Sequence, residues 1–588
     1  MNFSGKTIVL RLRWILPCLL VALLFAAYAG WRVWQVRSDL QAASTSAHRL
    51  RSALADGDQR AAERELATLQ GRSAAAADRT DGPLWSVLAA APLLGDDAAA
   101  VRTTSQALDA LSRDGLTPLV ASSADLDAGA FAPKAGTVPL DAVSGLAEPV
   151  GAGSDAFAAA RNRLDEVDPD GLVGPVRRPF EDLSRVVHDG ARALETADKA
   201  VRLLPSMLGG QDDRRYLLVV QNNAEVRATG GMPGAVALVD ARDGRIRMSR
   251  QATAGAFPEL KTPVLPLTAE ERAVFGGQLG VFFQDANFTP DFSRTAELLA
   301  ARWQQQYDGR LDGVLSVDPV ALSYLLEATG PVTVDGVTLS SANAADQLLN
   351  RTYLRLPDPK RQDAFFREVA RAVFDAVSSG TGSPQRLIEA LARGAGEGRL
   401  LVHSFDPAEQ RELDGTRVAG ELPGDADGRP QVGVYLNDAT GSKMSYYLDY
   451  TADVASTTCS DGRQRLTGQF AIGSRAPADA ASLPASITGG AGYGIPAGSQ
   501  MVATDIYGPV GGTLDDFVLD GKPLSPPVLH YQGRPVASLA LFFDPGQELD
   551  LTWRMTTGPG QTGDIDVRVT PGVRSGSPSS IAASGCRD

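Results

Sequence analysis

The sequence predicts a multi-domain α+β protein that consists of an N-terminal transmembrane helix, a helical stalk or bundle, a central α/β domain and a C-terminal β-sandwich. Three observations lead to this prediction. An uncharged apolar run lies near the N-terminus, Ala- and Leu-rich segments at helical spacing follow it, and alternating apolar segments dominate toward the C-terminus. A chain of 588 residues is long enough for several such folding units.

The composition is that of a globular protein, with 44% hydrophobic and 21% charged residues. The formal net charge of -14 argues against nucleic acid as a partner. An anionic ligand would therefore need a local cluster of arginines. The histidines and cysteines are scattered singly, so we expect no zinc site.

The first element that we expect is a transmembrane helix over residues 14–34. The run from Trp14 to Trp31 carries no charge, and a helix of that length spans roughly 27 Å, close to the hydrocarbon thickness of a bilayer. Basic residues before the run favour a cytoplasmic location for residues 1–13. We therefore expect a single-pass protein of the cell membrane, with the bilayer as a partner and its bulk outside the cytoplasm. A cleaved signal peptide is the alternative, although the run is long for one.

Residues 35–208 are expected to form an extracytoplasmic helical stalk or bundle. Ala, Leu, Arg, Glu and Gln recur at helical spacing over residues 38–70, with an Asp-Gly-Asp turn at 56–58. Helical patterns return after Trp85 and over residues 178–204. The apolar stripes of these segments are better explained as a bundle core than as a ligand pocket.

Residues 209–420 are expected to form a central α/β domain. Apolar or alternating runs at 216–223 and 235–249 indicate strands, whereas residues 292–307 and 319–329 have helical spacing. Strand-like and helix-like segments continue to alternate after these, which is typical of an α/β domain.

The C-terminal third is predicted to contain strands and few helices. A Gly-, Pro- and Asp-rich linker is expected over residues 421–430, a β-sandwich over 431–573 and a flexible tail over 574–588. Short alternating runs separated by turn-rich segments support the sandwich.

The three cysteines restrict the possible disulfides. Cys18 lies within the apolar run, so only Cys459 and Cys586 are available to pair outside the cytoplasm. A disulfide between the sandwich and the tail is therefore predicted.

The segment from Gln221 to Ala235 is the first candidate site. Arg227 and the amides of a glycine-rich loop follow a buried strand here, and ligands of α/β sheets often bind at strand ends. The loop also contains Asn222, Asn223 and Glu225. The alternative, which the residue types by themselves favour, is a structural turn with a local ion pair between Glu225 and Arg227.

A second candidate is the segment 350–371, where positive charge is concentrated in an acidic protein. Arginine binds phosphate and pyrophosphate through paired hydrogen bonds, so the segment is a candidate clamp for either group. A solvated helix face explains the same charges equally well. The basic residues are Arg351, Arg355, Lys360, Arg361, Arg367 and Arg371.

Asp285, Asn287 and Asp291 form a third candidate, because carboxylate and amide oxygens are ligands of divalent cations such as Mg²⁺. Polar loops of this kind are nevertheless common. The sequence contains no GxSxG, Walker or HExxH motif, so classical hydrolase and NTPase functions have no support.

Three segments resemble the bacterial membrane proteins that are grouped as domain of unknown function 4012. They are residues 216–234, 287–306 and 311–334, and residues 83–97 resemble the helical segment that precedes the family's domain. The resemblance implies membership of the family over roughly residues 80–410. It brings little information about function.

A more distant similarity, to the LytR-CpsA-Psr family, suggests a function. Members of that family are membrane-anchored enzymes that transfer glycopolymers from a polyprenyl-pyrophosphate carrier to the cell wall. Residues 312–334 followed by residues 354–373 are similar in order and spacing to a strand-helix segment and an Arg-rich helix of that family. Arg361 and Gln362 match an Arg-Gln pair there, and Arg355 matches an upstream arginine.

This similarity implies roles for individual residues. Arg227, Arg355 and Arg361 would bind the pyrophosphate, and Asp285 or Asp291 would bind Mg²⁺, which makes Arg227, Asp285 and Asp291 the predicted catalytic residues. The predicted ligand-binding residues are Asn222, Asn223, Glu225, Arg250, Arg355, Arg361 and Gln362. The family's Pro-Arg-Asp motif retains only its arginine here, as Arg250, which leaves open whether the chain is a glycopolymer phosphotransferase.

We therefore expect a cell-envelope protein that binds a polyprenyl-(pyro)phosphate-linked or other phosphorylated glycan, with transfer of the glycan left open. The alternative is a non-catalytic envelope scaffold that binds polysaccharide, cell-wall polymer or partner proteins. Convergence of the arginines in one cleft with a carboxylate would favour the first expectation, and their dispersal over the surface would favour the second.

Overall fold

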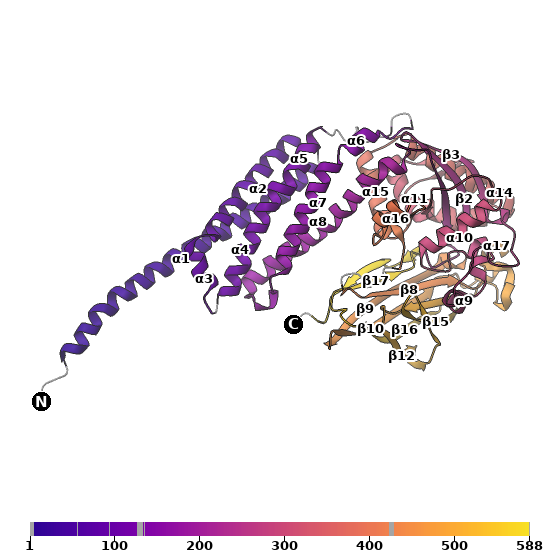
Figure 1. Cartoon of the computed structure of the whole chain (residues 1–588). Coiled ribbons are helices and arrows are strands. Elements are labelled where there is room, and N and C mark those ends of the chain that lie inside the picture. Colours follow the sequence, from indigo (N-terminus) through magenta and orange to yellow (C-terminus); the bar gives the residue numbers. More distant parts are fainter. Residues whose placement is uncertain are drawn as a thin grey trace. The chain divides into compact units, whose positions relative to one another are not determined.

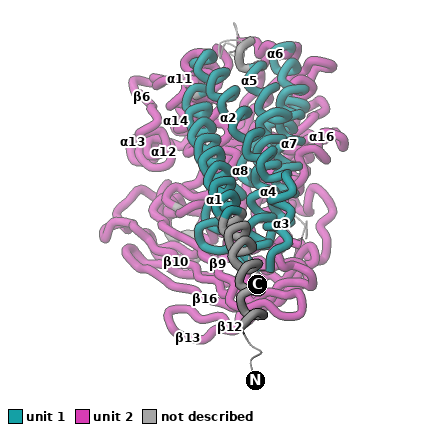
Figure 2. The backbone as a smooth tube through the Cα atoms, turned by 90° about the vertical axis from the view of Figure 1, so that its left-hand side faces the viewer, with its two compact units in different colours: residues 1–130, 141–204 teal, residues 131–140, 205–588 magenta. Residues whose placement is uncertain are grey.

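The computed structural model describes residues 5–55, 57–92, 94–125, 133, 136–422 and 428–586, without the side chains of 5–23, 25, 26, 55, 123–125, 491–493 and 575. These residues form two compact units (Figure 2). Unit 1 comprises residues 1–130 and 141–204, and unit 2 comprises residues 131–140 and 205–588.

Unit 1 is built from helices that pack along one another (Figure 1). Leu50 of α1 is buried together with Leu66 and Leu69 of α2, which forms the core between these two helices. Asp58 caps α2 by accepting a hydrogen bond from the amide of Ala61. The main helices are α1 (Gly5–Ala55), α2 (Gln59–Thr80), α3 (Pro83–Ala89), α4 (Gly95–Ala110), α5 (Leu116–Asp125), α6 (Leu140–Ser144), α7 (Ala147–Asp165) and α8 (Gly174–Met207), the ends of α6 and α8 belonging to unit 2.

The predicted transmembrane helix is not found, and this part of the predicted fold class is wrong. Among the described residues, no helix is both long enough and apolar enough to cross a membrane. The run from Trp14 to Trp31 lies inside α1, and most of its side chains lie outside the described part of the chain. The helix does not end with the apolar run but continues for about seven further turns, in which buried and exposed side chains alternate.

Unit 2 begins with a five-stranded sheet in the order β3-β2-β1-β4-β7. Strands β1 and β4 are parallel, whereas the other neighbouring strands are antiparallel. The carboxyl ends of β1 and β4 therefore meet at one edge of the sheet. The strands are β1 (Arg214–Asn222), β2 (Met232–Arg242), β3 (Arg245–Thr253), β4 (Gly313–Val317) and β7 (Leu400–Ser404).

Helices cover both faces of this sheet. Leu217 and Val219 of β1 contribute to a core that also contains side chains of α10, whereas Leu218 and Val220 point into a second core with α11, α14 and α15. This alternation explains why the strand reads as a continuous apolar run in the sequence. The helices of this region are α9 (Ala269–Phe275), α10 (Phe292–Gln304), α11 (Pro319–Thr329), α12 (Ala344–Asp346), α13 (Thr352–Arg355), α14 (Pro359–Ser378), α15 (Pro384–Gly396) and α16 (Pro407–Leu413), and a small hairpin is formed by β5 (Val332–Val334) and β6 (Val337–Leu339).

Two six-stranded sheets form the C-terminal sandwich, and its core is filled by large side chains such as Phe470, Leu541 and Trp553. The first sheet has the order β13-β12-β16-β10-β9-β18 and the second β14-β15-β11-β8-β17-β19. The strands are β8 (Gln431–Asp438), β9 (Leu448–Ser460), β10 (Arg463–Ser474), β11 (Gln500–Tyr507), β12 (Thr513–Leu519), β13 (Lys522–Leu524), β14 (Val528–Tyr531), β15 (Arg534–Phe543), β16 (Glu548–Thr556), β17 (Ile565–Val569), β18 (Arg574–Ser575) and β19 (Ser579–Ala582), with the short helix α17 (Ala485–Thr488) between β10 and β11.

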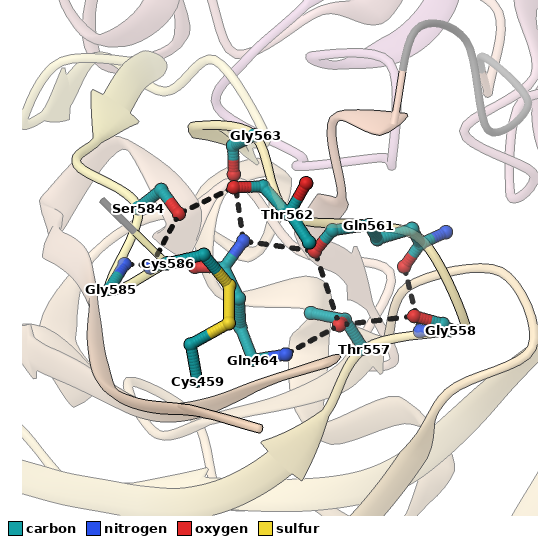
Figure 3. The surroundings of a disulfide bond; sticks show 10 residues. All are labelled: Cys459, Gln464, Thr557, Gly558, Gln561, Thr562, Gly563, Ser584, Gly585 and Cys586. Carbon is teal, nitrogen blue, oxygen red and sulfur yellow. Dashed lines mark hydrogen bonds between the residues drawn. A yellow bond between two sulfur atoms is a disulfide. The ribbon is translucent and has the colours of Figure 1, made fainter. Parts of the chain in front are cut away.

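The tail, which the sequence predicted to be flexible, is instead integrated into the sandwich. β18 pairs with β9 of one sheet, and β19 pairs with β17 of the other. A disulfide joins Cys459 to Cys586, and the amide of Gly585 donates a hydrogen bond to the Gln464 side chain beside it (Figure 3). The tail is polar in composition because its strands lie at sheet edges. Residues 423–427 of the expected linker lie outside the described part of the chain.

Candidate functional site

A cavity of about 300 Å³ lies between the central sheet and the helices that cover one of its faces. Its floor is formed by β1, β2 and β3 and by residues 254–255 that follow β3. Its opposite wall is formed by α11, α13, α14 and the π-helical turn Gln347–Arg351. The volume is at the lower end of the range for pockets that hold small organic ligands.

Small residues on the sheet side create the space. Ala235, Ala237 and Ala252 line the floor, where larger side chains would fill the cavity. The helices supply the large apolar side chains Leu322 and Phe366 on the other side.

The π-helical turn also shapes this wall. It brings the consecutive residues Leu348 and Leu349 to the cavity, whereas consecutive residues of a regular α-helix diverge by 100°. Single π-helical turns are often found at functional sites. Because these two leucines join Leu322 and Phe366 in the lining, the cavity is mainly apolar.

The charged side chains of the cavity lie in two groups. The first contains Lys443 together with Asn222 and Tyr353, in which the Asn222 amide donates to the Tyr353 hydroxyl over 2.7 Å. The second contains Asp363 and Arg367 of α14, one helical turn apart. An apolar cavity with a few polar groups is typical of a site for an amphiphilic ligand.

Arg227 does not reach this cavity but lies in a buried network of charges. Its side chain is 4% exposed and forms ion pairs with Glu225 at 3.0 Å and with Asp285 at 3.3 Å. Glu225 also accepts a hydrogen bond from Lys443 over 2.9 Å. Burial alone would raise the pKa of Glu225, but the two cations outweigh burial and hold that pKa below its usual range.

The same loop joins the central sheet to the sandwich. The amide of Val226 donates to the Ser445 hydroxyl, and the amide of Ala228 donates to the Asn437 side chain. Arg227 itself donates to the backbone oxygen of Asp438. We call the segment Asn222–Gly231 the latch loop. The predicted pyrophosphate-binding and catalytic role of Arg227 does not agree with this placement, because its side chain is buried and engaged in structural contacts.

The predicted metal ligands are also engaged. Asp285 is paired with Arg227, and burial raises the pKa of its carboxyl group despite this partner. Asp291 caps α10 by accepting from the amides of Ser293 and Arg294. In the part of the chain that the structure describes, no three His, Cys, Asp or Glu side chains are grouped to hold a metal ion. These residues do not fit the predicted Mg²⁺ site or the predicted catalytic roles of the two aspartates.

Two of the predicted ligand-binding residues do line the cavity. Asn222 lies at the end of β1, and Gln362 lies on α14, where its amide donates to the backbone oxygen of Leu356. Asn223 is buried next to the cavity wall and donates to Asp318 over 3.0 Å. Glu225 belongs to the latch loop described above.

The predicted arginines do not converge in one cleft. Arg250 and Arg355 are exposed and lie over the aromatic rings of Tyr307 and Phe365, respectively. Arg361 is exposed and does not line the cavity. The arginine of this segment that does line it is Arg367.

Sequence reasoning missed Lys443 and Tyr353. Lys443 comes from the sandwich and is separated from Glu225 by 218 residues, so no local pattern connects the two. The only signal was an isolated lysine directly before a Met-Ser-Tyr-Tyr run in an arginine-rich chain. Tyr353 lies inside the predicted basic segment, where the charges drew attention away from it.

Comparisons with known proteins identify a family but no function. The family described as "Protein of unknown function (DUF4012)" matches residues 211–353, which include β1 to β4, α10, α11 and the cavity wall up to Tyr353. No curated protein matches the chain. The similarity to the LytR-CpsA-Psr family is not shown by these comparisons and stays a prediction. The match confirms the predicted resemblance to the DUF4012 family over residues 211–353.

Proposed function

We propose that this protein binds an amphiphilic ligand of the polyprenyl-phosphate-linked glycan class, with the apolar chain of the ligand inside the cavity of unit 2. The observation that carries the proposal is the cavity itself, which is mainly apolar and has charged side chains in two places. A prenyl or similar chain would gain free energy from leaving water, at about 25 cal/mol per Å² of apolar surface buried. A sugar attached to the phosphate would remain outside.

The proposal is limited to binding. Arg227, Asp285 and Asp291 are the residues that transfer would require by resemblance, and each is engaged in ion pairs or helix capping. A ligand could displace these partners only by leaving buried charges unpaired, which typically costs several kcal/mol. Ligand capture therefore fits the structure better than glycan transfer.

The disulfide supports a location outside the cytoplasm. Disulfides persist in oxidising compartments and are rare where thiol reductants are abundant. Cys459 and Cys586 are joined across 127 residues, and their bond attaches the C-terminus to the sandwich. We therefore propose a location in the cell envelope, where lipid-linked glycans are used.

The test is a calorimetric titration of the full chain with farnesyl pyrophosphate, a short soluble prenyl probe. Ala370→Phe would fill the cavity from α14 and is expected to weaken binding by at least about tenfold, which corresponds to about 1.4 kcal/mol. Ala364→Phe is the matched control, because Ala364 is exposed on the same helix and does not line the cavity. Omission of Mg²⁺ is expected to have no effect.

Equal loss of binding in both variants, or unchanged binding in both, would contradict the cavity as the site. Absence of binding by the folded wild-type chain would favour the alternative of a non-catalytic scaffold. One observation favours that alternative. The latch loop fixes the sandwich to the central sheet, as expected for a rigid platform that displays the sandwich to a polysaccharide or a partner protein.

A further inference from the structure

The sandwich contributes a side chain to one end of the cavity. This end lies where the parallel strands β1 and β4 finish, and it is lined by Asn222 and Pro319. Lys443 precedes the short helical turn Met444–Tyr447 of the sandwich region and lines the same cavity. Ligands of open α/β sheets bind most often outside the carboxyl ends of strands.

Two hydrogen-bond donors meet at this end. The Lys443 ammonium has three hydrogens, and the partner recorded for it among the described residues is Glu225, at 2.9 Å. It lies 5.5 Å from the centre of the Tyr353 ring. The Tyr353 hydroxyl accepts from Asn222, and no acceptor for its own hydrogen is recorded in the described part of the chain. Both groups can therefore donate to a ligand.

The wall that carries Tyr353 is held by the sandwich. The hydroxyl of Tyr446 donates to Asp346, and the hydroxyl of Tyr447 donates to Asn350, so that both ends of the π-helical turn are attached. Tyr353 is also buried against Met444 and Ile487. These contacts fix Tyr353 with respect to Lys443, which is the preorganisation that a binding site needs.

Both donors keep their hydrogens near neutral pH. Burial disfavours the charged form of Lys443, but Glu225 outweighs burial and raises the pKa of the lysine. Burial raises the pKa of Tyr353 as well. Glu225 is shared between Lys443 and Arg227, and Arg227 has Asp285 as a second carboxylate partner.

We propose that Lys443 and Tyr353 form an oxyanion subsite for the phosphate group of the cavity's ligand, so that the sandwich selects the charge of that ligand. This inference rests on the proposed function. An ammonium and a hydroxyl that converge on one oxygen form charge-assisted hydrogen bonds, which are stronger than neutral ones. A neutral prenol would fill the same cavity without making these bonds.

Arg367 is the competing cation of the cavity. It lies on α14 one turn after Asp363, which also lines the cavity. Burial raises the pKa of Asp363, and Arg367 counteracts this effect. Arg367 has a carboxyl group near it on its own helix, whereas Lys443 lies beside a second donor, the Tyr353 hydroxyl. The Lys443 end is therefore the better site for an anion.

The experiment compares farnesyl phosphate with farnesol as probes of the full chain. Calorimetric titration gives the ratio of their dissociation constants for the wild type, Lys443→Met, Tyr353→Phe, Arg367→Gln and Arg361→Gln. We expect the wild type to prefer the phosphate. Lys443→Met should reduce this preference by about 10- to 100-fold and Tyr353→Phe by about tenfold. The two arginine variants should retain it, and Arg361→Gln, at a residue that does not line the cavity, should leave farnesol binding unchanged.

The outcomes separate this inference from the proposed function. If both probes bind and the preference for phosphate survives in Lys443→Met and Tyr353→Phe, the proposed subsite is wrong, while the cavity remains the binding site of the prenyl group. Loss of the preference only in Arg367→Gln or Arg361→Gln would place the phosphate on α14 and overturn the subsite. If neither probe binds to folded wild-type protein, the proposed function fails first and the inference fails with it.

A folding defect would not leave the inference undecided. Lys443→Arg keeps the charge, and it is expected to keep the preference for phosphate even where Lys443→Met is too unstable to titrate. Tyr353→Phe keeps the ion pair between Lys443 and Glu225. Unfolding curves of each variant identify those that are folded at the temperature of the titration.

Discussion

Arg227 and Lys443 are two buried cations on either side of Glu225, and they differ in how fully their hydrogens are used. Arg227 has two carboxylates and two backbone oxygens as partners, and its guanidinium lies over the ring of Phe288. Lys443 has one carboxylate and also lines a cavity. A cation whose terminal nitrogens are bonded to the protein, like Arg227, stabilises the fold, whereas one with hydrogens to spare beside a cavity is available to a ligand. Burial and charge alone would not distinguish the two.

The largest effect is expected when the latch loop is broken. Arg227→Met should lower the free energy of unfolding by about 3–5 kcal/mol, because it leaves Asp285 buried without a cation. Urea unfolding monitored by circular dichroism measures this change. A loss below about 1 kcal/mol would show that Arg227 is not the structural cation of the pair.

Sequence patterns do not distinguish the two cations. The apolar run of β1 and the helical spacing of α10 and α11 predicted the sheet and its helices, because these signals are local. The partners of Glu225 depend on Lys443, which approaches from 218 residues away. Sequence spacing contains no such information, so Arg227 and Lys443 could not be told apart and the cavity could not be predicted.

A smaller effect is expected on the cavity side of Glu225. Lys443→Met should lower the free energy of unfolding by about 1–2 kcal/mol, because Glu225 keeps Arg227 as a partner. The double variant with Arg227→Met should lose more than the sum of the two, since Glu225 then has neither cation. Additive losses in this double-mutant cycle would mean that the two cations do not share the carboxylate.

The smallest effect concerns the pH dependence of stability. The folded-state pKa of Glu225 is lowered from its ordinary value of 4.5. The contribution of Glu225 to the free energy of unfolding is therefore fully present above about pH 4.5 and is lost as the pH falls through the lowered pKa. Glu225→Gln should therefore flatten the decline of stability between about pH 5 and pH 3. Asp285 has a raised pKa and acts in the opposite direction, so Asp285→Asn serves as the control. An unchanged acid profile in Glu225→Gln would contradict the ionised network.

The C-terminal strands have a practical consequence for work with this protein. β18 and β19 occupy the outer edges of both sandwich sheets, next to β9 and β17. Truncation before Arg574 would uncover two rows of free backbone donors and acceptors on the same molecule, and such edges recruit strands from other copies. A shortened chain should therefore self-associate, and reduction of the disulfide should have the same consequence to a lesser degree. Affinity tags and truncation boundaries are best chosen so that β18, β19 and the disulfide stay in place.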